Sequence, residues 1–85
     1  MKLLNQVLIE GDLYCMAASV YTLKSDNIQI TVYPSSKKVD DKVSGHFTGS
    51  TKTEPLRVRI VGRLHSYISS IPIHIDADAI EVKPQ

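Results

Sequence analysis

Apolar and polar residues alternate with a period of two along much of the chain. Four segments show the alternation: residues 5–13, 27–34, 56–64 and 73–82. In the first of them Val7, Ile9 and Leu13 share one parity. Successive side chains of a strand point to opposite faces, so this pattern is typical of strands with one buried face. It therefore predicts four strands.

The long charged segment between the second and third of these strands is harder to assign. A fifth, weaker strand is predicted over residues 42–48. We expect the rest of residues 34–56 to form a long flexible loop, because it is charged and contains glycine and proline. No window has the apolar spacing of a three-turn helix. A circular dichroism spectrum with almost no helix is expected.

Glycines and a change of parity indicate where the strands bend. Gly11 and Gly62 fall on the core-facing parity late in their strands, where glycine commonly marks a sharp bend. Ile80 and Val82 switch parity near the end of the last strand, which indicates a bulge. Short strands that curl at glycines favour a barrel over a sandwich. The predicted fold is all-β, a five-stranded barrel with residues 1–85 as one domain.

Composition and charge narrow the class of protein. The chain of 85 residues has a net charge of +1, so any anion site must come from local placement of cations and not from the total. The single cysteine, Cys15, cannot form an internal disulfide, and we expect a cytoplasmic protein. No apolar run approaches the length of a membrane span or of a secretory signal core.

The reactive residues form no motif that predicts catalysis. The histidines, His46, His65 and His74, have neither HxH nor HExxH spacing, and Cys15 has no partner at metal-ligand spacing. A phosphate-binding P-loop and a Gly-x-Ser-x-Gly motif are also missing. We expect no enzyme, no cofactor and no metal, and we interpret the histidines as ordinary surface or loop residues.

Three segments, LNQVLIEGDL, RVRIVGRL and IHIDADAIEVKP, together resemble the bacterial single-stranded-DNA-binding protein family. Members open with Asn-x-Val-x-Leu-x-Gly-x-Leu, have a Val-x-Val-x-Gly-x-Leu fourth strand, and end on a strand with Ala-Glu-x-Ile/Val-Glu. The resemblance covers roughly half of the chain. The matching residues are Asn5, Val7, Ile9, Gly11 and Leu13, then Val58, Ile60, Gly62 and Leu64, then Ala77, Asp78, Ile80 and Glu81.

The resemblance implies an OB-fold and a role in DNA replication, namely sequence-tolerant binding of single-stranded DNA by a homo-oligomer, a dimer or tetramer. The sequence also departs from the family. It has no tryptophan, its third strand is reduced to about residues 42–49, and residues 50–55 are too short for the family's helix. It lacks the acidic C-terminal tail, as the short primosomal relatives do.

Binding of a single strand needs cations for phosphates and flat aromatic rings for bases. Tyr33 is followed by a basic segment with Lys37 and Lys38, so an aromatic ring for a base and cations for phosphates would lie close together. By the resemblance, Tyr33 and Phe47 lie nearest the family's binding regions. Three tyrosines are less clear: Tyr14 and Tyr21 could cover the barrel end, and Tyr67 could be a stacking tip or a subunit contact.

Three arginines share the polar parity of residues 56–64: Arg57, Arg59 and Arg63. A hairpin register that pairs Leu64 with Ile73 would place Arg59 opposite Asp78, an ordinary cross-strand ion pair. The other two arginines would then face no carboxylate. We therefore expect Arg57 and Arg63 to be available for phosphate.

The predicted function is sequence-tolerant binding of single-stranded DNA by a basic groove and aromatic stacking. An alternative is an OB-type protein–protein interaction module that has lost DNA binding. The missing tryptophan, the low net charge and the reduced third strand favour this alternative. We also expect self-association through the first strand, residues 4–10, with Leu4 and Leu8 on its non-core face.

Overall fold

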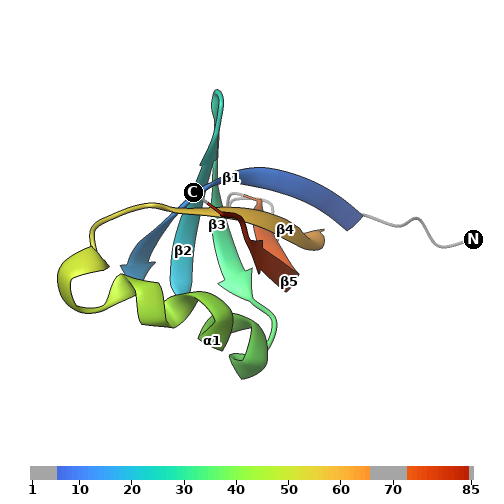
Figure 1. Cartoon of the computed structure of the whole chain (residues 1–85). Helices are drawn as coiled ribbons and strands as arrows, with labels where there is room; N and C mark the ends of the chain where they lie inside the picture. Colours follow the sequence, from blue (N-terminus) through green and yellow to red (C-terminus); the bar gives the residue numbers. More distant parts are fainter. Residues whose placement is uncertain (1–5, 66–72, 85) are drawn as a thin grey trace, which may run out of the picture.

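A computed structural model describes residues 6–65 and 73–84, which form a closed barrel of five strands (Figure 1). The order around the barrel is β1-β2-β3-β5-β4; β3 and β5 are parallel, and the other neighbours are antiparallel. The predicted five-stranded barrel is confirmed, and the architecture is consistent with an OB-fold. The strands are β1 (Gln6–Ala17), β2 (Val20–Ser25), β3 (Ile28–Pro34), β4 (Leu56–His65) and β5 (His74–Val82).

The barrel interior follows the predicted parity of the strands. Leu13, Val58 and Ile60 are completely buried, and the register joins inward residues across β1 and β4. In β3 the apolar residues are fully buried only toward the end of the strand. Val32 is buried, whereas Ile28, beside the hairpin turn, is exposed. The full buried apolar core is Leu13, Tyr21, Leu23, Val32, Val39, Val43, Leu56, Val58, Ile60, Ile75, Ala77 and Ile80.

A bulge in β5 explains the change of parity in its sequence. Val61 pairs with Ala79 and Gly62 pairs with Ala77, so Asp78 is the extra residue on β5. The bulge turns Ala79 outward and buries Ile80. The predicted bulge is therefore confirmed.

The fifth strand is not the segment that the sequence predicted. Residues 42–48 are helical, whereas Val20–Ser25 forms β2 between β1 and β3. The residue types of β2 alternate, but their burial does not, because Tyr21, Thr22 and Leu23 are all buried. Tyr21 and Leu23 belong to the core, while Thr22 pairs with outward residues of both neighbouring strands and is covered by them.

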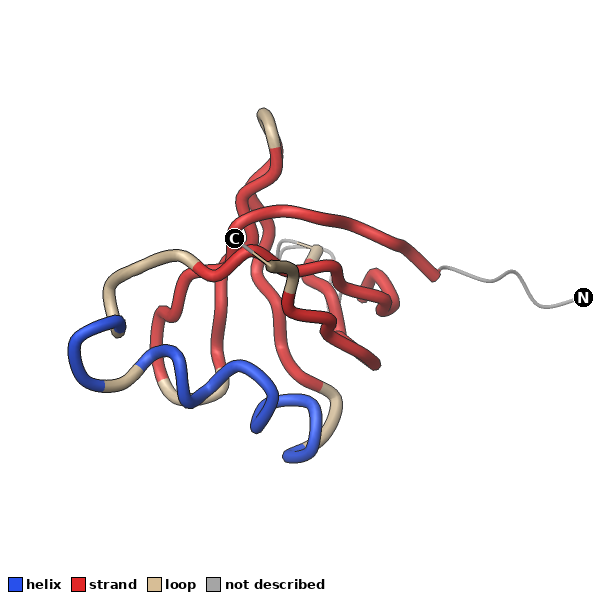
Figure 2. Tube along the Cα trace, viewed as in Figure 1, coloured by secondary structure: helices blue, strands red, loops and turns tan. Residues whose placement is uncertain are grey.

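Helical structure replaces most of the predicted flexible loop, so the expectation of almost no helix is wrong (Figure 2). The Ser36 hydroxyl caps α1 by accepting a hydrogen bond from the backbone N–H of Val39, 3.3 Å away. Val39 and Val43, one turn apart, bury the inner face of the helix against the barrel end (Figure 1). The helical elements are α1 (Lys37–Ser44), η1 (Gly45–Phe47) and η2 (Gly49–Thr51).

Asp40 ties α1 to the turn between β1 and β2. Its carboxylate accepts hydrogen bonds from Tyr21 Oη at 2.5 Å and from Ser19 Oγ at 3.2 Å. Tyr21 is only 1% exposed, and its ring packs against Phe47. Burial raises the pKa of the Tyr21 hydroxyl far above its ordinary value, and Asp40 adds to the shift. Tyr21 is therefore a core residue that holds the helix in place.

Candidate functional site

The outward side of β4 carries the three arginines, and each of them meets a carboxylate. Arg57 lies 3.7 Å from Glu10 and 3.4 Å from Asp12, both on β1. Arg59 lies between Glu10 and Glu81, at 3.8 and 3.4 Å. The predicted ion pairing of Arg59 is thus confirmed, but its partners are Glu10 and Glu81.

Arg63 is also paired, with its Nε 3.2 Å from Asp78 Oδ2. The prediction that Arg57 and Arg63 face no carboxylate is therefore wrong. The predicted register was incorrect: Leu64 pairs with Ile75, two residues beyond Ile73, and the β5 bulge shifts the later pairs by one more residue. Their role in binding DNA remains a prediction, but both arginines already have ionic partners.

Charge on the β1–β4–β5 side of the barrel is consequently balanced. The arginines of β4 lie between acidic residues of β1 and acidic residues of β5. These pairs are partly exposed, and exposed pairs stabilise a fold by about 0–1 kcal/mol each. Among residues 6–65 and 73–84, this side provides no continuous cationic track for a phosphate backbone.

The other outward surface, formed by β1, β2 and β3, has a different composition. We call it the β1–β3 face and define it by the outward residues Tyr14, Thr22, Lys24, Gln29, Thr31 and Tyr33. Tyr14 pairs with Thr22, which in turn pairs with Thr31, and Lys24 pairs with Gln29. Aromatic, amide, hydroxyl and ammonium groups thus share one continuous strand surface.

Tyr33 lies on this face, where the alternation predicted it, and is 38% exposed. Its ring meets the ring of His74 edge to face, with centroids 4.7 Å apart. His74 is only 3% exposed, and its Nε2 lies 3.2 Å from Asp76 Oδ1. The interpretation of His74 as a surface or loop residue is therefore wrong: it is a buried strand residue that supports the Tyr33 ring.

Tyr14 belongs to the same face and does not cover the barrel end as the sequence suggested. The Lys24 ammonium lies 4.7 Å from the centroid of its ring, a cation–π contact across β1 and β2. Lys24 lies opposite Asp12 in the register of β1 and β2, but Asp12 pairs with Arg57, and Lys24 forms no ion pair among the described residues. Neither residue was among the sequence-predicted site residues, because β2 itself was not recognised.

The remaining predicted site residues lie on α1 and η1. Lys37 pairs with Asp41 at 3.1 Å, on the first turns of α1. Lys38 lines a shallow groove between α1 and β5. Phe47 is half-buried against Tyr21 and is partly committed to the core. The predicted residues are thus spread over several surfaces, and Tyr67 lies outside the described residues.

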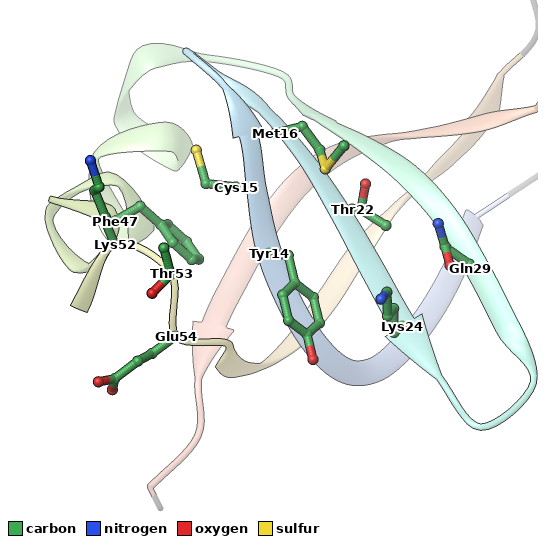
Figure 3. A pocket seen from close by; sticks show the side chains of 10 residues that line it. All are labelled: Tyr14, Cys15, Met16, Thr22, Lys24, Gln29, Phe47, Lys52, Thr53 and Glu54. Atoms are coloured by element: carbon green, nitrogen blue, oxygen red, sulfur yellow. The ribbon is translucent and has the colours of Figure 1, made fainter. Parts of the chain in front are cut away.

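A pocket of about 360 Å³ opens beside Tyr14 (Figure 3). Strand residues form one wall, and the connection from η1 to β4 forms the other. Tyr14 stands between Lys24 on one side and Phe47, Thr53 and Glu54 on the other (Figure 3). The lining residues are Tyr14, Cys15, Met16, Thr22, Lys24, Gln29, Phe47, Lys52, Thr53 and Glu54.

Comparison with models of known protein families and with curated protein sequences gives no match. Within residues 6–65 and 73–84, no cluster of three or more His, Cys, Asp or Glu could hold a metal ion. In the same residues, no helix has the length and apolar character needed to cross a membrane.

Proposed function

We propose that the protein binds single-stranded DNA, with little overall preference for base sequence, on the β1–β3 face. One observation carries the proposal: this face combines Tyr14, Lys24 and Tyr33, while the arginines of β4 are neutralised by their neighbours. In OB-folds the surface of strands 2 and 3 is the one that commonly binds oligonucleotides. The resemblance to single-stranded-DNA-binding proteins supports the same activity.

The binding mechanism is electrostatic capture followed by stacking of bases. Stacking on an aromatic side chain contributes about 1–3 kcal/mol per base, and it tolerates any base because every base has a π-face. Lys24 and Lys52 line the pocket beside Tyr14 and supply nearby cations for phosphates. With so few unpaired cations the affinity is weak, and the dependence on salt is shallow.

Fluorescence anisotropy with an oligothymidine at low salt tests the proposal. Tyr33→Ala should weaken binding about fivefold or more with little change in the salt slope, since stacking releases no counterions. Lys24→Ala should flatten the log–log salt slope by about 0.7. Lys42→Ala is the matched control, because this lysine lies on α1 beside β5 and away from the β1–β3 face. Its slope should equal that of the wild type.

A second function, as a protein–protein interaction module, has one specific observation in its favour. On the balanced β1–β4–β5 side, Leu8, Val61 and Ala79 lie in one row across the three strands, and Leu8 is 64% exposed. An apolar centre with a polar rim is the usual composition of a protein interface. If no oligothymidine binding appears at low salt, the DNA proposal is wrong and this function takes its place.

The setting we propose is the cytoplasm. A single exposed cysteine, Cys15, suits a reducing compartment. The family resemblance supports a role in DNA replication.

A further inference from the structure

Glu54 stands out among the acidic residues of the protein. All nine Asp and Glu residues lie within the described ranges. Seven of them accept a hydrogen bond or form an ion pair; Asp26 and Glu54 do neither through their side chains. Asp26 is at the tip of the β2–β3 hairpin, whereas Glu54 lines the pocket beside Tyr14. Its carboxylate is therefore available to a ligand there.

The backbone around Glu54 is held in place although its side chain is not. Its N–H donates a hydrogen bond to the carbonyl of Thr51 at 3.0 Å. Its own carbonyl oxygen lies 2.9 Å from His46 Nε2, and it accepts this hydrogen bond. Lys24 and Lys52 line the same pocket, yet neither forms an ion pair with the carboxylate. The pocket thus presents an acceptor at a fixed point of the chain, with two cations nearby.

We propose that this pocket holds one base of the bound strand and that Glu54 favours cytosine over thymine at that position. This inference rests on the proposed binding of single-stranded DNA. An ionised carboxylate only accepts hydrogen bonds. Cytosine presents an exocyclic amino group as a donor, and carboxylates pair with it; thymine presents a carbonyl oxygen in the corresponding place. A thymine would therefore set an acceptor against the carboxylate.

The other lining residues fit a nucleotide in the same orientation. Tyr14 offers its ring for stacking, on the side of the pocket opposite the connection that carries Glu54 (Figure 3). Lys24 and Lys52 can neutralise the phosphates that flank the base. A volume of about 360 Å³ falls within the usual range for small-ligand pockets. Stacking elsewhere on the face stays tolerant of sequence, and the preference is confined to this pocket.

The test compares the affinities for oligocytidine and oligothymidine of equal length, measured by fluorescence anisotropy at one salt concentration. In Glu54→Gln, the ratio of the two affinities should shift toward thymidine by about fivefold relative to wild type, because the glutamine amide can both donate and accept. Glu54→Ala should shift the ratio in the same direction. Asp41→Asn is the matched control, since it removes one negative charge on α1, away from the pocket.

The outcomes separate the pocket inference from the proposed function. If both oligonucleotides bind and the ratio is the same in wild type and both Glu54 variants, the pocket inference is wrong while DNA binding stands. If Asp41→Asn shifts the ratio as much as Glu54→Gln, the effect is one of net charge, and the inference is again wrong. If neither oligonucleotide binds the wild type, the proposed function fails. Urea unfolding of both Glu54 variants should match the wild type, because the side chain of Glu54 has no partner to lose.

Discussion

Gly62 occupies the position where β4 bends against the bulge of β5. A Cβ atom there would overlap the carbonyl oxygen of Asp76 and lie 2.8 Å from Ile75 Cγ2. The φ angle of Gly62 is not positive, so any residue could adopt its backbone conformation. The position needs glycine because a side chain would clash with the neighbouring strand. Close approach of this kind allows the two strands to curve together and close the barrel.

Gly62→Ala should therefore lower the free energy of unfolding by about 1–3 kcal/mol, the usual range for overpacking a well-packed site. Gly45→Ala is the matched control, because a Cβ at Gly45 meets nothing within 4 Å and its φ of −64° is helical. This control should be neutral or stabilise by up to about 1 kcal/mol. Urea unfolding measures both, and equal midpoints for the two variants would contradict this account of the bend.

The arginines of β4 show which properties of a residue the sequence can predict. The alternation correctly placed Arg57, Arg59 and Arg63 on the outward side, because parity fixes the face of a strand. It did not give their partners, because a register shift of two residues keeps every side chain on its face. The bulge at Asp78 then moved the register by one residue more. The sequence thus predicted the direction of the arginine side chains, but it did not predict whether they are free to bind phosphate.

Among the elements, the four strands with clear alternation were predicted, whereas β2 and α1 were not. β2 does alternate in sequence, but only from Tyr21 to Lys24, which is at the lower limit of the length that indicates a strand. α1 has only eight residues and two buried valines, too few for a periodic signal. A helix this short is stable only because it packs against the barrel and is capped at its N-terminus, and a sequence pattern does not show that packing. Short elements that rely on their neighbours are the ones that a pattern misses.

Ser36→Ala should destabilise the protein by about 1 kcal/mol, because it removes the acceptor for the N–H of Val39 at the first turn of α1. Ser50→Ala, in the exposed η2 turn, should have no such effect, since Ser50 has no side-chain partner among the described residues. Thermal unfolding followed by circular dichroism compares the two. A melting temperature for Ser36→Ala equal to that of Ser50→Ala would contradict the role of the cap.

For the molecule as a whole, the barrel separates two outward surfaces with different properties. The β1–β4–β5 side pairs its charges, while the β1–β3 face carries the partly exposed rings of Tyr14 and Tyr33 and one ammonium group, that of Lys24, which forms no ion pair among the described residues. A net charge of +1 conceals this difference. Tyr33 could be predicted from one strand alone. Tyr14, Lys24 and Glu54 converge from three segments of the chain, and only the pairing of β1 with β2 and the course of the η1–β4 connection bring them together.

β1 is longer than its pairing with β2, which leaves part of one edge uncovered. Residues Gln6 to Leu13 pair with β4, but pairing with β2 begins only at Asp12. Ser25 Oγ donates a hydrogen bond to the carbonyl of Glu10 at 2.8 Å and covers the end of this stretch. In the part of the chain that the structure describes, the edge before Glu10 has no strand beside it. Uncovered edges of this kind favour pairing with another chain.

We expect a symmetric dimer in which the first halves of two β1 strands pair antiparallel. Leu4, the other residue predicted at this contact, lies outside the described residues. Leu8 would approach its counterpart on the same face, and the contact would cover part of its 64% exposed side chain.

Leu8→Lys should shift the protein toward monomer, because like charges opposite one another destabilise a strand pair. Ile28→Lys is the matched control, since Ile28 is 56% exposed but lies on the β2–β3 hairpin. Light scattering across a range of protein concentrations should show the wild type and Ile28→Lys as dimers where Leu8→Lys is monomeric. A wild type that remains strictly monomeric at high concentration would rule out the dimer.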